Sequence, residues 1–342
     1  VGFLSFKFTS TCEQDITIAY GEHLVDGCVR QKIDIRDFSI TYRAKVGENI
    51  FLNPFRRLAC RYLEVHSDEP LAIEKMAIAP TMYVLEEKER PLLTEKQNQI
   101  YDMCVETLHL CMHEHYEDCP WREQALYAMD SRNQMLCGYY AFGEYKFPRA
   151  SLQLISKDNR EDGLLSICYP MSMDFVIPSF SLHYITACRE YMQYSGDKEF
   201  LEEIYPKLVS VVETFTNRIT DGLVPPFEGK KYWNFYEWRK GLDGGGPASE
   251  GFDSSVPDVL LNALLSIALQ NLSTIAGELG IANTYKEQAD MLNARIYEVF
   301  WDKDAGICYN YPNHKSYSQL GNALAILCGA VTGEEALSVC ER

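Results

Sequence analysis

The sequence predicts a two-part protein, with an antiparallel β-sandwich over residues 1–90 and a helical domain over residues 91–342. Two patterns predict this division. Apolar and polar residues alternate in the first part, which is typical of half-buried strands. From residue 94 onward, apolar residues recur every three or four positions, which is typical of amphipathic helices. A charged stretch that ends at Pro91 separates the two patterns, and we place the domain boundary there.

Short strands joined by tight turns predict the sandwich. The turn Val25-Asp26-Gly27 is one example, and short turn-linked strands of this kind are typical of antiparallel sandwiches. The alternating segments occur at residues 6–8, 16–20, 33–42, 62–65 and 73–78.

The helical part begins with a capping signal. Thr94 followed by Gln97 is the signature of a capping box, in which each side chain bonds the backbone N–H of the other residue. No strand pattern alternates with the helices, which excludes a doubly wound α/β domain. Further helices are predicted at 122–144, 147–158, 177–194, 198–218, 256–278, 284–299, 317–329 and 334–342.

Two of the predicted helices repeat one pattern. Gly196-Asp197 opens one helix, Gly280 precedes another, and an Asp/Gly turn follows each of them. Repeated helical hairpins build toroids. A closed (α/α)6 toroid contains six hairpins, and about nine helices fit into this chain. We therefore expect an incomplete (α/α)6 toroid, truncated at its C-terminal end.

Charge and hydropathy exclude two classes of partner. Lys and Arg total 32 against 49 Asp and Glu, and the formal net charge is −17. Nucleic acids and anionic membrane surfaces both require a basic protein surface, so we expect neither as a partner. The most apolar run, Val259 to Leu269, is interrupted by Asn262 and Ser266 and predicts a buried helix.

Cysteine and histidine spacing argues against disulfides and metal sites. The twelve cysteines form no CxxC pair and lie in apolar stretches, which is typical of a reducing compartment. We expect a cytoplasmic protein, while a periplasmic or secreted location stays open. His109 and His113 lie four residues apart without an HExxH motif, so we expect no metal in the site. We expect no cofactor, and the acidic excess leaves a structural calcium ion open.

The densest polar cluster is Asp118-Cys119-Pro120-Trp121-Arg122-Glu123, followed by Asp130. An isolated aspartate before a proline more often caps a helix. Here Glu123 and Asp130 are two helical turns apart, so a helix over 122–144 would place them on one face. Carboxylates on one helix face repel each other, so such a row indicates a functional role. Paired carboxylates with aromatic neighbours are the groups that glycoside hydrolysis uses.

This run of residues resembles the signature of the family 78 glycoside hydrolases, the α-L-rhamnosidases. The segment from Phe55 to Val65 is similar to the end of the β-sandwich that precedes the catalytic (α/α)6 barrel in that family. The resemblance covers nearly the whole chain. Many family members have glycine directly before the second aspartate, whereas this chain has Met129, which leaves the role of Asp130 open.

The resemblance implies hydrolysis of a terminal α-L-rhamnosyl linkage with inversion. Glu123 would be the general acid, Asp118 and Asp130 would hold sugar hydroxyls at the catalytic centre, and Arg122 would orient them. Neighbouring carboxylates raise the pKa of such an acid by repulsion. The general base of the family lies in a Thr-x-x-Trp-Glu segment that does not occur before Arg342. We therefore expect the base downstream and expect this chain to be inactive alone.

An aromatic segment, Tyr232 to Trp238, resembles a loop that lines a sugar subsite. We expect Trp233, Asn234, Glu237 and Trp238 to contact the substrate, with packing on the barrel rim as the alternative. The expected partner is a rhamnoside, either a small molecule or an oligosaccharide, and a homo-oligomer stays open. Two other functions stay open as well: an (α/α)6 glycosidase for a different sugar, and a carbohydrate-binding protein without catalysis.

Overall fold

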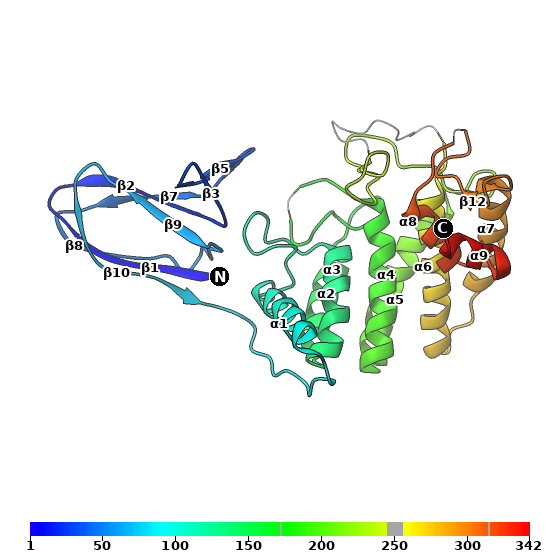
Figure 1. The fold of residues 1–342 in the computed structure, drawn as a ribbon. Coiled ribbons are helices and arrows are strands. Elements are labelled where there is room, and N and C mark those ends of the chain that lie inside the picture. Colours follow the sequence, from blue (N-terminus) through cyan, green and yellow to red (C-terminus); the bar gives the residue numbers. More distant parts are fainter. Residues whose placement is uncertain (172, 245–255, 314) are drawn as a thin grey trace. The chain divides into compact units, whose positions relative to one another are not determined.

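The computed structural model describes residues 1–171, 173–244, 256–313 and 315–342. The chain forms two compact units, Val1–Leu126 and Tyr127–Arg342. Antiparallel sheets come first and helices follow, which confirms the predicted order of β and then α (Figure 1). The first helix begins after residue 90 but groups with the sheets in the first unit. The domain boundary at residue 90 stays a prediction.

Two three-stranded antiparallel sheets build the first unit. Their strand orders are β10-β1-β8 and β7-β2-β9. Two small hairpins, β3-β4 and β5-β6, precede β7. The strands are β1 (Gly2–Ser10), β2 (Gln14–Gly21), β3 (Leu24–Val25), β4 (Cys28–Val29), β5 (Lys32–Ile33), β6 (Arg36–Asp37), β7 (Ser39–Ala44), β8 (Gly47–Leu52), β9 (Tyr62–His66) and β10 (Leu71–Pro80).

The two sheets share one hydrophobic core. Phe6 and Phe8 of β1 and Ile16 and Ile18 of β2 are fully buried in a single cluster. Each such side chain contributes roughly 1.5–3 kcal/mol when it leaves water. Because the alternate residues of each strand point away from this cluster, the period-two pattern of the sequence produces the two-sheet packing.

The predicted capping box is confirmed at the start of α1 (Glu95–Leu110). The Thr94 hydroxyl accepts a hydrogen bond from the Gln97 backbone N–H at 3.4 Å. The Thr94 N–H donates to Gln97 Oε1 at 2.9 Å. Two backbone donors without a partner inside the helix are thus satisfied by a local sequence signal.

Helices dominate the second unit, where α4 to α7 lie side by side (Figure 1). The central helix α6 packs against α4, α5, α7 and α8. By length and composition it could span a membrane, but 72% of its apolar window is buried in the fold, as predicted for a core helix. The helices are α2 (Ala128–Ala141), α3 (Lys146–Ser156), α4 (Pro178–Ser195), α5 (Lys198–Thr216), α6 (Val259–Glu278), α7 (Tyr285–Phe300), α8 (Gln319–Leu327) and α9 (Gly333–Cys340), with a short hairpin of β11 (Trp301–Asp302) and β12 (Ile307–Cys308).

The helix predicted over 122–144 begins only at Ala128. Residues 121–127 form turns and extended backbone, and Gln124 has a left-handed φ of 53° that no α-helix accommodates. Glu123 therefore lies outside α2, and the prediction that it shares a helix face with Asp130 is wrong.

Candidate active site

The cluster around Glu123 lies on a closed loop, Asp118 to Ala125. Asp118 and Ala125 bond each other twice. The Asp118 N–H donates to the Ala125 carbonyl, and the Ala125 N–H donates to Asp118 Oδ1, both at 3.1 Å. Inside the loop, the Gln124 side chain donates to the Pro120 carbonyl at 2.7 Å. Asp118 therefore closes the loop and does not cap α2, whose N-cap residue is Tyr127.

Trp121 anchors this loop in the core of the β-sandwich. Its side chain is buried, and its ring centroid lies 4.7 Å from that of Phe38 and 5.6 Å from that of His23. A Cβ atom on Gly21 would approach the Trp121 ring to 3.3 Å, so glycine leaves room for the indole. Trp121 thus serves to hold the loop, and its buried ring is no platform for a sugar.

A buried ion pair anchors the start of the loop. Arg57 pairs with Glu117, and their side chains are 9% and 1% exposed. Arg57 also contacts the exposed Glu114 at 2.8 Å. The residue directly before Asp118 is thereby tied to the segment between β8 and β9.

Glu123 lies on this loop with a quarter of its side chain exposed. Its Oε1 accepts a hydrogen bond from Arg36 Nη2 on β6 at 3.0 Å. Both residues line a cavity of about 370 Å³ within the first unit. The other lining residues are Tyr20, Asp37, Phe38, Phe55, Arg56, Arg57, Trp121, Arg122 and Gln124.

The electrostatics of Asp118 follow mainly from burial. Burial raises the pKa of Asp118, and the nearby charge of Glu123 acts in the same direction. The Ala125 N–H, which stabilises the ionised form, opposes this shift. Repulsion between the two carboxylates therefore acts on Asp118, but as a smaller cause than burial.

Asp130 belongs to the second unit. It lies in the first turn of α2, where a carboxylate is favourable near the positive end of the helix dipole. Asp118, Arg122 and Glu123 come together in the first unit. The convergence of Asp130 with them stays a prediction.

The aromatic segment 232–238 forms a packed cluster in the second unit. The Trp233 indole N–H donates to the Asp243 carbonyl at 2.6 Å, and its ring lies 5.5 Å from the Trp238 ring. Trp238 is 82% exposed, whereas Glu237 is partly buried. Of the four residues expected to contact substrate here, Trp238 offers the most open face.

Asn234 uses its whole amide group inside this segment. It is buried, its Oδ1 accepts from the Phe227 N–H at 3.1 Å, and its Nδ2 donates to the Phe227 carbonyl at 2.9 Å. This geometry gives Asn234 a structural role, because it joins the loop backbone at Phe227 to the aromatic segment. A substrate contact by Asn234 stays a prediction.

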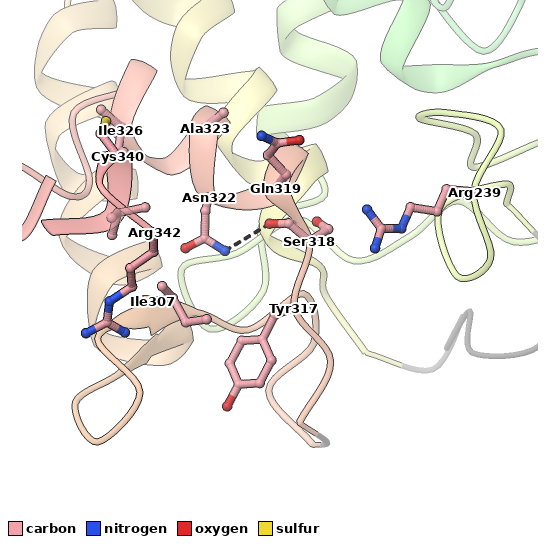
Figure 2. Close-up of a pocket in the computed structure, with 11 residues that line it drawn as sticks. Arg239, Ile307, Tyr317, Ser318, Gln319, Asn322, Ala323, Ile326, Cys340 and Arg342 are labelled. Atoms are coloured by element: carbon pink, nitrogen blue, oxygen red, sulfur yellow. Dashed lines mark hydrogen bonds between the residues drawn. The ribbon is translucent and has the colours of Figure 1, made fainter. Parts of the chain in front are cut away.

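A second cavity, of about 570 Å³, lies in the second unit. Figure 2 shows Arg239 across from the start of α8, where Asn322 donates a hydrogen bond to the Ser318 carbonyl at 2.9 Å. None of its eleven lining residues is Asp, Glu or His. Although this cavity is the larger, it lacks a carboxylate for proton transfer, so the cavity beside Glu123 is the better candidate.

Sequence reasoning assigned no role to two arginines of the site. Arg36 and Arg56 line the Glu123 cavity, although Arg56 lies in the segment from Phe55 to Val65 that resembles the family. In the second unit, fully buried Asp258 caps α6 through the Leu261 N–H at 2.7 Å and accepts from the Tyr236 hydroxyl at 2.8 Å. Burial raises the pKa of Asp258 to about 6.

The residues that the structure describes contain no cluster of side chains that could bind a metal ion. No three His, Cys, Asp or Glu residues there come close enough to hold an ion. His113 bonds the Leu110 carbonyl through its ring at 3.0 Å, and burial lowers its pKa.

Comparisons with known proteins connect this geometry to one family. The model of the bacterial α-L-rhamnosidase six-hairpin glycosidase domain matches residues 94–342. A family 78 rhamnosidase from Bacillus sp. GL1 superposes with a TM-score of 0.87 at 25% identity, over 99% of this chain and 35% of that chain. The rhamnosidase from Klebsiella oxytoca with rhamnose bound gives 0.79 at 19% identity, over 99% and 68%.

An α-L-rhamnosidase from Dictyoglumus thermophilum gives a TM-score of 0.76 at 21% identity, over 99% of this chain and 38% of that chain. The comparison with curated proteins gives no match. The chain spans about a third of the length of the Bacillus rhamnosidase. Because the domain match extends over most of the sequence, the chain belongs to family 78 of the glycoside hydrolases, the bacterial α-L-rhamnosidases.

Proposed function

We propose that the protein containing this chain hydrolyses terminal α-L-rhamnosyl linkages with inversion, with Glu123 as the general acid. One observation carries the proposal: the closed Asp118–Ala125 loop presents a partly exposed carboxylate, Glu123, at the edge of a cavity. Family membership supports rhamnosides as the substrate class. We also propose that the helices from α1 onward form part of an (α/α)6 toroid.

In this mechanism, Glu123 donates its proton to the glycosidic oxygen as the bond from that oxygen to the rhamnosyl C1 breaks. Water attacks C1 from the opposite face, and a second carboxylate takes the proton that the water loses. The sum of these steps is the addition of one water molecule across the glycosidic bond. We place the general base outside residues 1–342, as expected from the sequence, and we propose that this chain alone is inactive.

The loop gives Asp118 a second task besides binding a sugar hydroxyl. Its Oδ1 accepts from the Ala125 N–H, so the group that would hold the sugar also fixes the loop that carries the acid. A rigid link of this kind keeps the acid at a constant position relative to a bound sugar, which general acid catalysis requires.

Glu123→Gln in the full-length protein tests the role of the acid. The amide keeps the shape but removes the proton donor, so we expect a loss of roughly 10²–10⁴ in rate on rhamnosides with poor leaving groups. Activated aryl rhamnosides need less protonation and lose less. Glu48→Gln is the matched control, because Glu48 is an exposed carboxylate on β8 outside the cavity. Equal rates for Glu123→Gln and wild type on poor leaving groups would remove Glu123 from the acid role.

The stereochemistry of the product tests inversion separately. Proton NMR of the first-formed sugar, recorded before mutarotation, should show the β-anomer of rhamnose. The α-anomer as first product would refute inversion. Rhamnose binding without hydrolysis of any glycoside by the full-length protein would instead support a carbohydrate-binding protein.

A further inference from the structure

The cavity beside Glu123 is lined mainly by positive charges, although the chain as a whole is acidic. Four arginines line it, Arg36, Arg56, Arg57 and Arg122, against two carboxylates. The chain as a whole carries a formal net charge of −17. Like charges that gather in one cavity repel each other, and this repulsion is offset when an anion binds between them.

Two of the four guanidinium groups are already neutralised. Arg57 pairs with Glu117 and Glu114, and Arg36 pairs with Glu123 at 3.0 Å. These carboxylates offset the positive charges of Arg57 and Arg36.

The other two guanidinium groups keep their charge. Arg56 donates to the Tyr20 hydroxyl at 2.8 Å, and its guanidinium carbon lies 5.5 Å from the Tyr20 ring centroid. These contacts orient the guanidinium group without neutralising it. Across the part of the chain that the structure describes, neither Arg56 nor the exposed Arg122 has a carboxylate partner. An oriented, charged guanidinium group is well suited to bind a carboxylate through two parallel hydrogen bonds.

We propose that this cavity binds the carboxylate of a uronic acid residue to which the rhamnosyl group is attached, with Arg56 and Arg122 as specificity-determining residues. The inference rests on the proposed function and names the acidic saccharide that the site would accept. A cavity of about 370 Å³ falls within the roughly 300–1,000 Å³ of small-ligand pockets.

The position of Glu123 explains why the carboxylate of the leaving sugar would reach this cavity. Glu123 would protonate the glycosidic oxygen, so the leaving sugar lies next to it. In a uronic acid linked through O4, the carboxylate is attached to C5, the carbon next to the linkage. A sugar whose O4 meets Glu123 therefore carries its carboxylate into the immediate surroundings of Glu123, where the arginines are.

The test uses the full-length protein and compares a rhamnosyl-(1→4)-glucuronate with its methyl ester, in which a methyl group removes the charge of the carboxylate. We expect wild type to prefer the acid in kcat/KM by roughly tenfold or more, since a hydrogen bond to a charged group is stronger than one to a neutral group. Arg56→Gln should lower kcat/KM for the acid by roughly 10–100-fold and lower kcat/KM for the ester by a much smaller factor. Arg56→Lys, which keeps the charge, should recover part of the loss.

Arg61→Gln is the matched control. Arg61 also lies against a tyrosine ring, 5.7 Å from the Tyr62 centroid, but does not line the cavity. Arg61→Gln should leave kcat/KM unchanged for both the acid and the ester. Equal kcat/KM for acid and ester in wild type, or equal effects of Arg56→Gln and Arg61→Gln, would overturn the inference and leave the proposed function intact.

A binding measurement separates the two possible failures. In NMR titrations, free glucuronate should bind more tightly than glucose, and Arg56→Gln should weaken glucuronate binding by tenfold or more. Glucuronate that binds no better than glucose overturns the inference whatever the hydrolysis result. If the full-length protein hydrolyses neither disaccharide, the proposed function is refuted. The assignment of the carboxylate to a leaving group is then refuted as well.

Discussion

Replacing Arg57 with methionine should destabilise the first unit strongly, because it leaves Glu117 buried without its cation. The Glu117 side chain is 1% exposed, so water cannot replace the guanidinium group. Breaking a buried ion pair by removing one partner costs roughly 3–5 kcal/mol. The contact of Arg57 with Glu114 adds little, since Glu114 is 73% exposed and surface pairs contribute about 0–1 kcal/mol.

The double variant Arg57→Met with Glu117→Leu separates the buried charge from the lost packing. If the buried carboxylate that has lost Arg57 causes the destabilisation, removing it should restore most of the stability, because apolar replacements of buried pairs are often neutral or stabilising by about 1–4 kcal/mol. The single variant Glu117→Leu should be destabilised as well, since it leaves Arg57 with only its exposed partner.

Urea unfolding of the chain labelled with 5-fluorotryptophan is a suitable assay. The protein contains four tryptophans, of which Trp121 lies in the first unit and packs in its core. Its fluorine resonance, assigned with Trp121→Phe, reports on the unfolding of that unit separately from the helices. A loss below about 1 kcal/mol for Arg57→Met, or a double variant no more stable than the single one, would refute the argument.

Two further predictions concern the second unit. The pKa of Asp258 in the folded protein, about 6, lies above the ordinary value of 3.8. The protonated side chain therefore stabilises the fold fully below about pH 4, and this stabilisation is lost as the pH rises toward 6. Asp258→Asn should remove about 3 kcal/mol of this pH dependence of the unfolding free energy. Urea titrations between pH 4 and 7 measure it, and an unchanged slope would contradict it. Asn234→Ala should cost roughly 2–5 kcal/mol by leaving two buried Phe227 backbone groups unpaired, without raising KM for a rhamnoside. A raised KM at unchanged stability would instead make Asn234 a substrate ligand.

Local signals in the sequence determined much of the fold. The capping box of Thr94 and Gln97 operates across three residues, so the sequence alone locates the start of α1. Apolar periodicity likewise predicts the buried strands β1 and β2 and the core helix α6, since a repeat of two or of three to four places alternate side chains on one face. The Asp118 to Glu123 motif was enough to predict the family.

Tertiary contacts decided how the site is built. Periodicity predicts a helix through Glu123, but Asp118 and Ala125 close a loop there and Trp121 packs against Phe38, far away in the sequence. The pairing of Arg36 with Glu123 joins residues 87 positions apart.

No local pattern encodes such contacts, because their free energy arises only when the sandwich core has formed and places distant side chains against one another. The sequence thus indicated Asp118 and Glu123 as candidate carboxylates of this loop, through the short-range chemistry of a motif. The tertiary structure decided that the acid candidate lies on a loop and that arginines surround it, because both depend on the packing of segments that are remote along the chain.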